Sequence, residues 1–316
     1  MSEPPPLPEG FSVGHWFDPD ARTGCTVVIP PPATRGGVQV QGGGPGTREI
    51  ETLNPLSRSE EATAVLLTGG SAFGLAAADG VSRWLERHER GYWTPGGRVP
   101  LVPTAVIYDL VGRDPKVRPG PKEGYAACDA AVGGVPERGA VGVGAGATVG
   151  KMLGRDRASV GGFGYAAIVT GTGETVATVA AVNASGDVLA EDGSVLAGPR
   201  GDDGEIVRGA ELLVAMEKVA EFKPPEGNTT LICVCTDAAL SKRDCGMVAR
   251  AAVAGIARAV DPTFTPVDGD VAFCLASGQG EPAPMAALQI GAAAATVTAA
   301  AIRDAVRQAG SEAPAS

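Results

Sequence analysis

Three consecutive residues, Asn228, Thr229 and Thr230, offer the most distinctive chemistry in this chain. They follow a loop rich in proline and glycine at 223–227 and precede the apolar run LICVC at 231–235, so a hydroxyl stands at the start of a predicted buried strand. If the bond between Asn228 and Thr229 were cut, Thr229 would carry both a hydroxyl and an α-amino group. An α-amine titrates at about pH 8 and can act as the base for its own hydroxyl. The segment therefore predicts a nucleophile that needs no histidine.

Histidine is scarce, since the chain has only His15 and His88. His88 lies in the charged end of a predicted helix, where we expect an exposed side chain. His15 stands near the start of the chain, and we expect it to have a packing or surface role. A Ser-His-Asp triad or a histidine-ligated metal would have to be built from these two residues, so the sequence argues against both.

The six cysteines also argue against a metal site. Cys233 and Cys235 are two apart on a predicted strand and should face the same side. No second close pair and no nearby histidine completes a zinc site. We expect these residues to be small buried hydrophobic side chains in a reducing cytosol, with the full set at positions 25, 128, 233, 235, 245 and 274.

A glycine-rich stretch at 139–164 contains Lys151. Its segment GAGATVGKM at 144–152 is similar to a phosphate-binding loop, but Ala145 replaces the first glycine and Met152 replaces the Ser or Thr that would bind magnesium. Nucleotide binding is therefore a poor fit. The stretch is better interpreted as a close-packed loop that brings an amine into a site, where it could lower the pKa of a nucleophile or steady negative charge. An ordinary surface lysine is the alternative.

Two other motifs place polar groups at strand ends. Asp268 and Asp270 flank a glycine, and in extended chain their carboxylates would point to the same side. Such a pair could orient an ammonium group or bind a hard metal, although a solvated Asp-Gly turn is the alternative. Asn183 follows a predicted strand and could donate to a developing oxyanion, or simply form a turn. Gly69, Gly70 and Ser71 join a strand to a helix, in a form that can hold an anion or serve as a tight turn capped by Ser71.

Composition limits the class of protein. The 316 residues are 44% hydrophobic but only 4% aromatic, with 46 glycines and 25 prolines, which favours a β-rich chain with many tight turns. The net charge of −10 without a basic stripe argues against nucleic acid as a partner. The longest apolar stretch, 284–302, reads as a buried helix rather than a membrane span. The N-terminus lacks the features of a signal peptide, so we expect a cytoplasmic protein.

Hydrophobic periodicity predicts alternating strands and helices in layers, in a single domain over residues 1–316. The expected strands cover 25–29, 37–40, 64–68, 104–110, 174–183, 229–236 and 271–276, and the expected helices cover 72–90, 123–132, 209–221, 241–260 and 284–308.

Several of these motifs together resemble a known family. The chain is similar, from about residue 10 to 309, to the self-processing L-aminopeptidase and D-amidase/esterase family, which includes β-peptidyl aminopeptidases and nylon-oligomer hydrolases. The resemblance is carried by LTGGSAFGL at 67–75, ADGV at 78–81, PTAVIYD at 103–109, VNA at 182–184, GNTT at 227–230 with TDA at 236–238, and DGD at 268–270.

The resemblance implies an α/β fold, a four-layer αββα sandwich similar to N-terminal nucleophile hydrolases but with different connectivity. It implies autocleavage between Asn228 and Thr229 into an α chain of residues 1–228 and a β chain of residues 229–316, which stay together as αβ units that commonly form tetramers. No metal or organic cofactor is implied. The implied catalytic set is Thr229 as nucleophile, Lys151 as site lysine, Asn183 for the oxyanion, Tyr108 beside the nucleophile, and Asp268 with Asp270 to orient the new terminus and the lysine.

The implied activity is hydrolysis of a small peptide or oligoamide through an acyl-enzyme. Classical aminopeptidases of the family use serine, whereas Thr229 and the Asp-Gly-Asp pair look more like the branch that cleaves nylon (6-aminohexanoate) oligomers. The methyl of threonine restricts the rotamer of the hydroxyl but does not fix the substrate. Two other hypotheses stay open: an acyltransferase of the glutamate N-acetyltransferase type, whose Ala-Thr-Met cleavage motif is absent, and an unprocessed assembly protein without activity.

Overall fold

Two five-stranded sheets form the centre of the molecule. The computed structural model describes residues 3–111, 114–217 and 227–312. The first sheet is antiparallel except where β5 and β8 run parallel. In spatial order its strands are β1 (Ser12–Asp18), β2 (Thr23–Ile29), β5 (Val65–Thr68), β8 (Thr104–Val106) and β4 (Thr47–Arg48).

The second sheet contains the strand that begins at the predicted nucleophile. The β15 and β17 strands run parallel at its centre, and the other neighbours are antiparallel. Asn183, the last residue of β12, lies directly opposite Thr229, the first residue of β15. In spatial order the strands are β11 (Gly162–Val169), β12 (Thr175–Asn183), β15 (Thr229–Ala239), β17 (Val271–Gly278) and β3 (Arg35–Val40).

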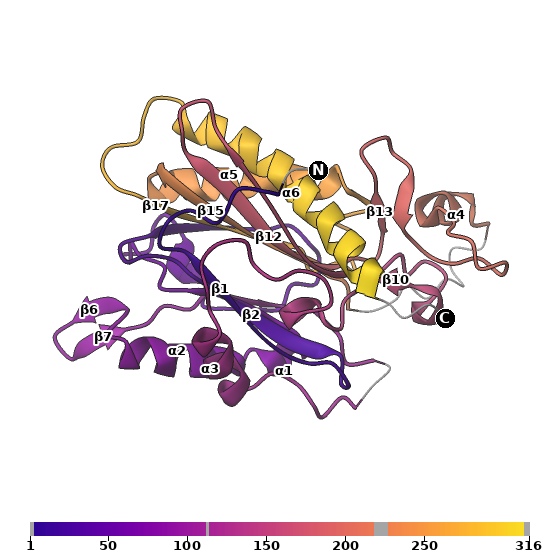
Figure 1. The fold of residues 1–316 in the computed structure, drawn as a ribbon, viewed down its shortest axis with the longest axis horizontal. Helices are drawn as coiled ribbons and strands as arrows, with labels where there is room; N and C mark the ends of the chain where they lie inside the picture. The colour runs from indigo at the N-terminus through magenta and orange to yellow at the C-terminus, as the bar shows by residue number, and fades with distance from the viewer. Residues whose placement is uncertain (1–2, 112–113, 218–226, 313–316) are drawn as a thin grey trace.

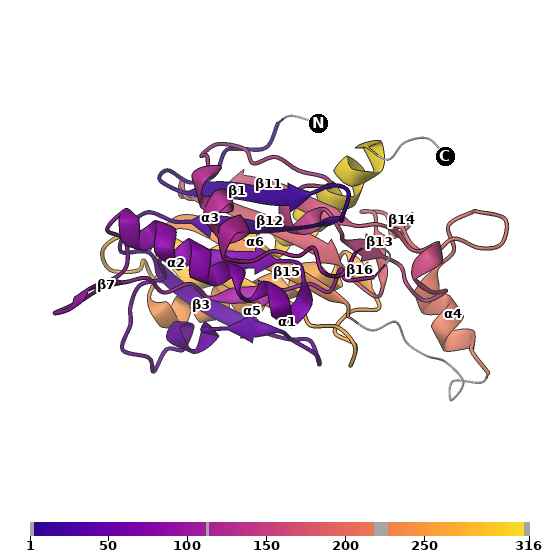
Figure 2. The same cartoon turned by 90° about the horizontal axis from the view of Figure 1, so that it is seen from below.

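Helices cover the outer face of each sheet, which completes four layers in the order αββα (Figures 1 and 2). On the second sheet lie α5 (Lys242–Ala257) and α6 (Ala286–Glu312), and on the first lie α2 (Ala77–Arg87) and α3 (Pro121–Asp129). Residues 286–311 of α6 are apolar and long enough to cross a membrane by length and composition, but here the helix packs on α5, β11 and β12. The predicted layered α/β architecture is confirmed.

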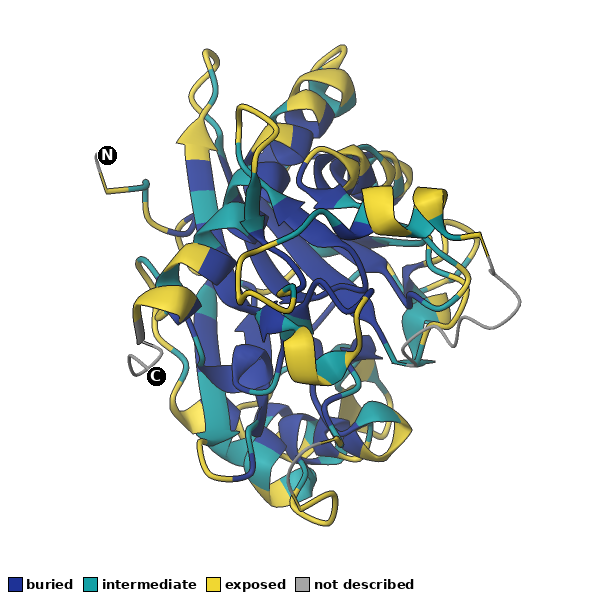
Figure 3. Cartoon of the chain, turned by 90° about the vertical axis from the view of Figure 1, so that its right-hand side faces the viewer, coloured by how far each residue is buried: buried dark blue, intermediate teal, exposed yellow. Residues whose placement is uncertain are grey.

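The strand β15 shows how the core is divided. Leu231 and Cys233 face the cluster between the two sheets, whereas Ile232 and Val234 face α5 and α6. Cys235 shares the inner face with Cys233, as the two-residue period of a strand requires. By the same alternation, Thr229 faces the space between the sheets. Figure 3 shows the buried strands enclosed by helices with exposed outer surfaces. All six cysteines are buried and reduced, as predicted.

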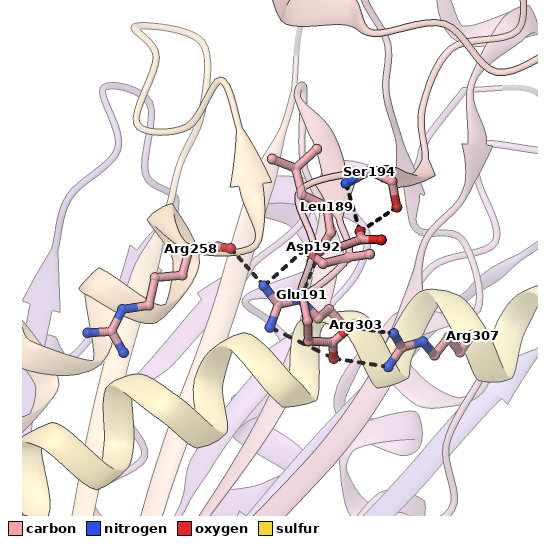
Figure 4. A network of polar contacts seen from close by, with 8 residues as sticks. Leu189, Glu191, Asp192, Ser194, Arg258, Arg303 and Arg307 are labelled. Carbon is pink, nitrogen blue, oxygen red and sulfur yellow. Dashed lines mark hydrogen bonds and ion pairs between the residues drawn. The ribbon is translucent and has the colours of Figure 1, made fainter.

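A group of short elements surrounds the end of the second sheet and completes the fold. The C-terminal helix holds this group in place: Arg303 donates to Leu189 O at 2.8 Å and to Arg258 O at 2.9 Å, and Arg307 pairs with Glu191 at 2.8 Å (Figure 4). Among the residues that the structure describes, the remaining short elements are η1 (Ile50–Leu53), α1 (Ser71–Gly74), β6 (Tyr92–Thr94), β7 (Gly97–Val99), η2 (Gly142–Gly144), β9 (Thr148–Val149), η3 (Arg155–Arg157), β10 (Ser159–Val160), β13 (Asp187–Leu189), β14 (Val195–Ala197), α4 (Gly209–Ala215) and β16 (Val260–Asp261).

Several sequence expectations differ from the structure. The strand expected over 104–110 ends at Val106 as β8, so Tyr108 lies in the loop that follows it. The helix expected over 72–90 is split into α1 and α2, and at the end of α1 Gly74 packs so closely on Gly69 O that an added Cβ would lie 1.8 Å from it. Gly70, with φ of 78°, occupies the cap position that was assigned to Ser71. Strands β1 and β11 were not predicted, because their glycines and aromatic residues interrupt the alternating pattern. The helix expected at 209–221 ends at Ala215 as α4, because Met216 is extended, and residues 218–221 lie outside the described part of the chain.

Candidate active site

The hydroxyl of Thr229 is buried beside the carbonyl of the preceding residue. Thr229 is 5% exposed, and its Oγ1 donates to Asn228 O at 2.5 Å. The backbone N–H of Gly269 donates to the same oxygen at 2.7 Å. This carbonyl belongs to the bond that would be cut, so a fixed donor already faces the oxygen on which negative charge would develop.

Gly269 reaches this position only because it has no side chain. A Cβ built on it would lie 2.8 Å from Thr229 Oγ1 and 2.7 Å from Gly44 O, which is closer than such atoms approach. The parallel bridge between Asn228 and Asp268 brings the two backbones together here. The glycine between the two aspartates is therefore part of the site, which the sequence analysis did not recognise.

Asn183 lies across the sheet from Thr229, and its side chain is buried. Its Nδ2 donates to Gly227 O at 3.2 Å and to Tyr108 O at 3.3 Å. Its Oδ1 accepts from the backbone N–H of Thr148 at 3.1 Å, a group that can only donate, and this fixes the orientation of the amide. In the uncut chain the Asn183 amide thus faces the carbonyl one residue upstream of Asn228 O.

Lys151 is fully buried behind Asn183. Its Nζ donates to Asn183 O at 2.8 Å and to Asn183 Oδ1 at 3.0 Å. The glycine-rich loop delivers it there through a backbone bond from Lys151 N to Ser185 O of 2.9 Å. Burial, followed by the nearby charge of Arg155, lowers the pKa of Lys151 well below its ordinary value, and the Asp268 carboxylate opposes this shift. The alternative of a surface lysine is wrong.

The acidic pair is buried and its two members have separate partners. Asp268 accepts from Ser185 Oγ at 2.9 Å and from the hydroxyl of Thr265. Asp270 Oδ1 accepts from the backbone N–H of Thr230 at 2.6 Å. Burial, and then the charge of Asp268, raises the pKa of Asp270 to about 7. The alternative of a solvated Asp-Gly turn is wrong, and the pair instead holds the start of β15.

Tyr108 and Arg155 enclose the residue before Asn228. Gly227 has φ of 73° and packs on Tyr108 so closely that an added Cβ would lie 2.3 Å from the ring carbon Cγ. Arg155 Nη2 donates to Gly227 O at 3.3 Å, and its guanidinium lies 5.3 Å from the Tyr108 ring centroid. Nothing in the sequence around Arg155 indicated this role, because Arg155 and Gly227 are 72 positions apart and only the fold brings them together.

The glycine-rich turn at the start of α1 binds the side-chain carboxylate of Asp109. Gly70 N donates to Asp109 Oδ1 at 2.7 Å, and Thr23 Oγ1 donates to Asp109 Oδ2 at 2.7 Å. Burial raises the pKa of Asp109, although these two bonds oppose the shift. The turn therefore anchors the loop that carries Tyr108, and its N–H groups are not an empty anion site.

Neither histidine joins this constellation. His15 contacts Thr26 Oγ1 at 2.9 Å and packs edge-on against Phe163, and burial lowers its pKa to about 4. His88 is exposed and contacts Trp84 O at 2.7 Å. Within residues 3–111, 114–217 and 227–312, no cluster of three His, Cys, Asp or Glu side chains fits a metal ion.

The six residues expected to form the site thus converge on the start of β15. A buried hydroxyl lies on a peptide carbonyl, a backbone N–H polarises that carbonyl, and a buried amine and two carboxylates stand around it. This arrangement is suited to attack of the hydroxyl on an acyl carbon through a tetrahedral oxyanion.

Comparisons of sequence place the chain in a family of peptidases. The profile of peptidase family S58 matches residues 9–314. An uncharacterized aminopeptidase of Mycobacterium leprae (strain TN) is 44% identical over 86% of this chain and 78% of its own length. A 6-aminohexanoate-oligomer endohydrolase of Kocuria sp. (strain KY2) is 32% identical over 85% of this chain and 74% of its own length.

Solved structures show the same fold at low sequence identity. A β-aminopeptidase of Burkholderia sp. aligns with a TM-score of 0.64 and 23% identity, over 95% of this chain and 84% of that protein. The L-aminopeptidase D-Ala-esterase/amidase of Ochrobactrum anthropi, a variant of the Ntn hydrolase fold, aligns with a TM-score of 0.68 and 18% identity, over 94% and 84% of the two chains. The expected fold class is confirmed.

Proposed function

The chain belongs to peptidase family S58 and is a hydrolase of peptide or amide bonds, and from that premise we propose that it processes itself and then uses Thr229 as its nucleophile. The observation that carries the proposal is the position of Asn228 O, which accepts from Thr229 Oγ1 at 2.5 Å and from Gly269 N at 2.7 Å. A hydroxyl and an oxyanion donor thus meet at one peptide carbonyl.

Self-cleavage would proceed in two steps. Thr229 Oγ loses its proton and bonds to the carbonyl carbon of Asn228, and the negative oxygen is stabilised by the N–H of Gly269. The bond from that carbon to the nitrogen of Thr229 breaks, and the nitrogen takes up a proton to become an amine. Water then hydrolyses the ester, which leaves a carboxylate on Asn228 and restores the hydroxyl of Thr229.

The first step takes place before the amine of Thr229 is free, so another group must receive the hydroxyl proton. Two groups with shifted pKa values support this step. Lys151 has its pKa lowered well below the ordinary value by burial, and Asp270 has a pKa of about 7. Asp270 can therefore exchange a proton near neutral pH, and the downward shift of the pKa of Lys151 favours its neutral amine, which is the form that can accept a proton.

Hydrolysis of a substrate would repeat this chemistry with the freed amine as the base. Thr229 Oγ attacks the substrate carbonyl and the leaving amine takes the proton, which gives an acyl-enzyme that water cleaves. The N–H of Gly269 would stabilise the oxyanion with Tyr108 nearby, and the Nδ2 of Asn183 would hold the next carbonyl upstream, as it holds Gly227 O in the uncut chain. Lys151 would hold Asn183 in place through its two hydrogen bonds, and Asp268 and Asp270 would orient the new terminus.

Two substrate classes are candidates, and the first is short peptides with a free N-terminus, as the names of several relatives suggest. A second candidate is the endo-hydrolysis of 6-aminohexanoate (nylon) oligomers, which the relatives at 32% identity favour. A panel of amino-acid anilides and 6-aminohexanoate oligomers would separate them by relative kcat/KM.

We propose further that the α chain of residues 1–228 and the β chain of residues 229–316 stay together as a cytoplasmic tetramer of αβ units. The support is the family resemblance alone. Light scattering on the purified protein would give the mass of the assembly, and a mass of one αβ unit would contradict the tetramer.

The self-processing mechanism is tested by mass spectrometry and anilide hydrolysis on the purified protein. The wild type should contain two chains that begin at the native N-terminus and at Thr229. Thr229→Ala should give one uncut chain and at least a thousandfold lower hydrolysis, because it removes the attacking oxygen. Thr229→Ser keeps that oxygen and serves as the matched control. Full turnover in uncut protein would refute the mechanism.

A further inference from the structure

The carbonyl one residue upstream of the cleavage point is held by two donors. Gly227 O accepts from Asn183 Nδ2 at 3.2 Å and from Arg155 Nη2 at 3.3 Å. The same Arg155 lines a cavity of about 190 Å³ together with Asp109 and Thr148, so a ligand can reach its side chain. A guanidinium and a buried amide therefore converge on one peptide carbonyl that is not itself cut.

The position of Gly227 O indicates where one carbonyl oxygen of a bound substrate would lie. In self-cleavage Asn228 becomes esterified to Thr229 Oγ, and in turnover the acyl part of a substrate becomes esterified to the same oxygen. The two esters are chemically the same acyl-enzyme, with Asn228 in the place of the acyl residue. Gly227 O then stands where a substrate would carry the carbonyl of a group acylating its α-nitrogen. This step rests on the proposed function.

We infer that Arg155, with Asn183, recognises that upstream carbonyl, so the enzyme prefers acyl residues whose α-nitrogen is acylated over residues with a free α-ammonium. The substrate class is N-acylated amino-acid amides and internal peptide bonds, and the action is endo rather than exo. Arg155 is a specificity-determining residue of the site.

Hydrogen bonding gives the physical reason. The guanidinium of Arg155 and the Nδ2 of Asn183 can only donate, and a carbonyl oxygen can only accept, so the two match. An α-ammonium also donates only, and it leaves both groups without the oxygen that they face in the uncut chain. It also adds a positive charge beside Arg155. A bond from a guanidinium is charge-assisted, so its loss should be measurable in kcat/KM.

Gly227 also limits the size of the acylating group. Its φ of 73° and its contact with Tyr108 leave no room for a Cβ, which would lie 2.3 Å from the ring. Acetyl and glycyl groups present only the atoms that Gly227 itself places there. An L-leucyl group would have to displace the Tyr108 ring. The preferred acylating groups are therefore acetyl and glycyl.

The test compares matched p-nitroanilides on the processed enzyme, with asparagine as the acyl residue because Asn228 occupies that place. The four substrates are asparagine p-nitroanilide and its N-acetyl, glycyl and L-leucyl derivatives. We expect kcat/KM for the acetyl and glycyl compounds to exceed that of the free amine by about tenfold or more. The leucyl compound should be the poorer of the two dipeptide substrates.

Arg155→Met should lower kcat/KM for the acetyl compound about tenfold more than kcat/KM for the free amine, mainly through KM. Arg157→Met is the matched control, because it removes a guanidinium from the same turn that pairs instead with exposed Asp202 at 2.6 Å. It should leave the ratio of acetyl to free amine unchanged. If Arg155→Met stays uncut, the wild-type ratio alone decides the question.

The outcomes separate this inference from the proposed function. Two chains, loss of hydrolysis in Thr229→Ala and a wild-type preference for the free amine would overturn the inference and leave the proposed function intact. An equal loss on both substrates in Arg155→Met would also overturn it. A single uncut wild-type chain that hydrolyses none of the four anilides would overturn the proposed function, and the inference with it.

Discussion

Lys151 and Lys242 are both buried, yet their surroundings differ. Lys242 begins α5 and donates to backbone carbonyls of η1 and of the loop after it: to Thr52 O at 2.7 Å, to Ser57 O at 3.3 Å and, closer still, to Ser59 O. The two hydrogen bonds of Lys151 go to a single residue, Asn183, which in turn reaches the residues around the cleavage point.

Burial alone therefore does not identify a functional lysine. Burial lowers the pKa of both side chains, and the nearby carboxylate of Glu60 opposes the shift at Lys242 as Asp268 does at Lys151. What differs is the identity of the acceptors. Lys242 donates to backbone carbonyls and so links the start of α5 to the segment around η1. Lys151 donates to Asn183 and so positions the Asn183 side chain in the site. Lys242 should therefore matter for stability and Lys151 for catalysis.

Exchanging each lysine for methionine tests this contrast most strongly. Lys151→Met should lower self-cleavage and anilide hydrolysis at least a hundredfold, because Asn183 loses the donor that holds it. Lys242→Met should leave both rates within threefold but lower the free energy of unfolding by about 2 kcal/mol, because it leaves loop carbonyls without their donor. Gel analysis, initial rates and urea unfolding measure these effects.

The stability of the Lys151→Met variant should be compared with that of Thr229→Ala, since both chains are expected to stay whole. Equal unfolding midpoints would show that the lost activity is not a folding defect. If Lys242→Met abolished cleavage in a folded protein, or Lys151→Met left it intact, the distinction between the two lysines would be wrong.

Gly269 and Gly70 offer the same contrast between catalysis and stability, with an expected effect on the self-cleavage rate of about tenfold. Gly269→Ala places a methyl 2.8 Å from Thr229 Oγ1 and should slow self-cleavage at least tenfold, because the N–H is moved off Asn228 O. Gly70→Ala strains a residue with φ of 78° and should lower stability by about 1 kcal/mol, because its N–H anchors Asp109 rather than the cleavage point. Time courses of chain cleavage and thermal melts distinguish them. Equal cleavage rates in the two variants would contradict the assignment of Gly269.

The smallest effect concerns Asp270 and pH, measured in the uncut Thr229→Ala background. A pKa raised to about 7 means that the folded protein holds the proton more tightly than the unfolded chain. The stability from this group is therefore complete below about pH 4 and is lost as pH rises towards 7. Between pH 5 and pH 6 the loss should be about 1 kcal/mol, and it should vanish in Asp270→Asn. Parallel pH profiles of unfolding free energy in the two proteins would contradict this.

The elements of the second sheet were accessible from the sequence because their patterns are strong. The runs that became β15 and β17 contain continuous apolar segments, whereas the run that became β12 alternates loosely, and both patterns are typical of buried strands. Strands β1 and β11 were missed because local pattern does not report the pairing that stabilises them. Gly14 in β1, for example, is required by its packing on the α3 backbone, where an added Cβ would lie 2.0 Å from Ala127 O.

The site residues were accessible only in part, for a related reason. Tyr108, Lys151, Asn183, Asp268 and Asp270 could be named from motifs, but each also had an ordinary structural interpretation. Their convergence depends on contacts between segments far apart in the chain, such as that between Lys151 and Asn183, which are separated by 32 positions. Arg155 and Gly269 gave no signal, because one side chain and one N–H group acquire their roles only from the atoms that the fold places opposite them.

The sequence by itself determined that a hydroxyl stands at the head of a buried strand in a chain with almost no histidine, and residue type and hydrophobic pattern suffice for that. Only the tertiary structure decided which donor faces Asn228 O, which lysine is inside the site and which guanidinium holds the upstream carbonyl. Hydrogen bonds act over about 3 Å, and distances of that size between remote segments are set by packing rather than by local sequence.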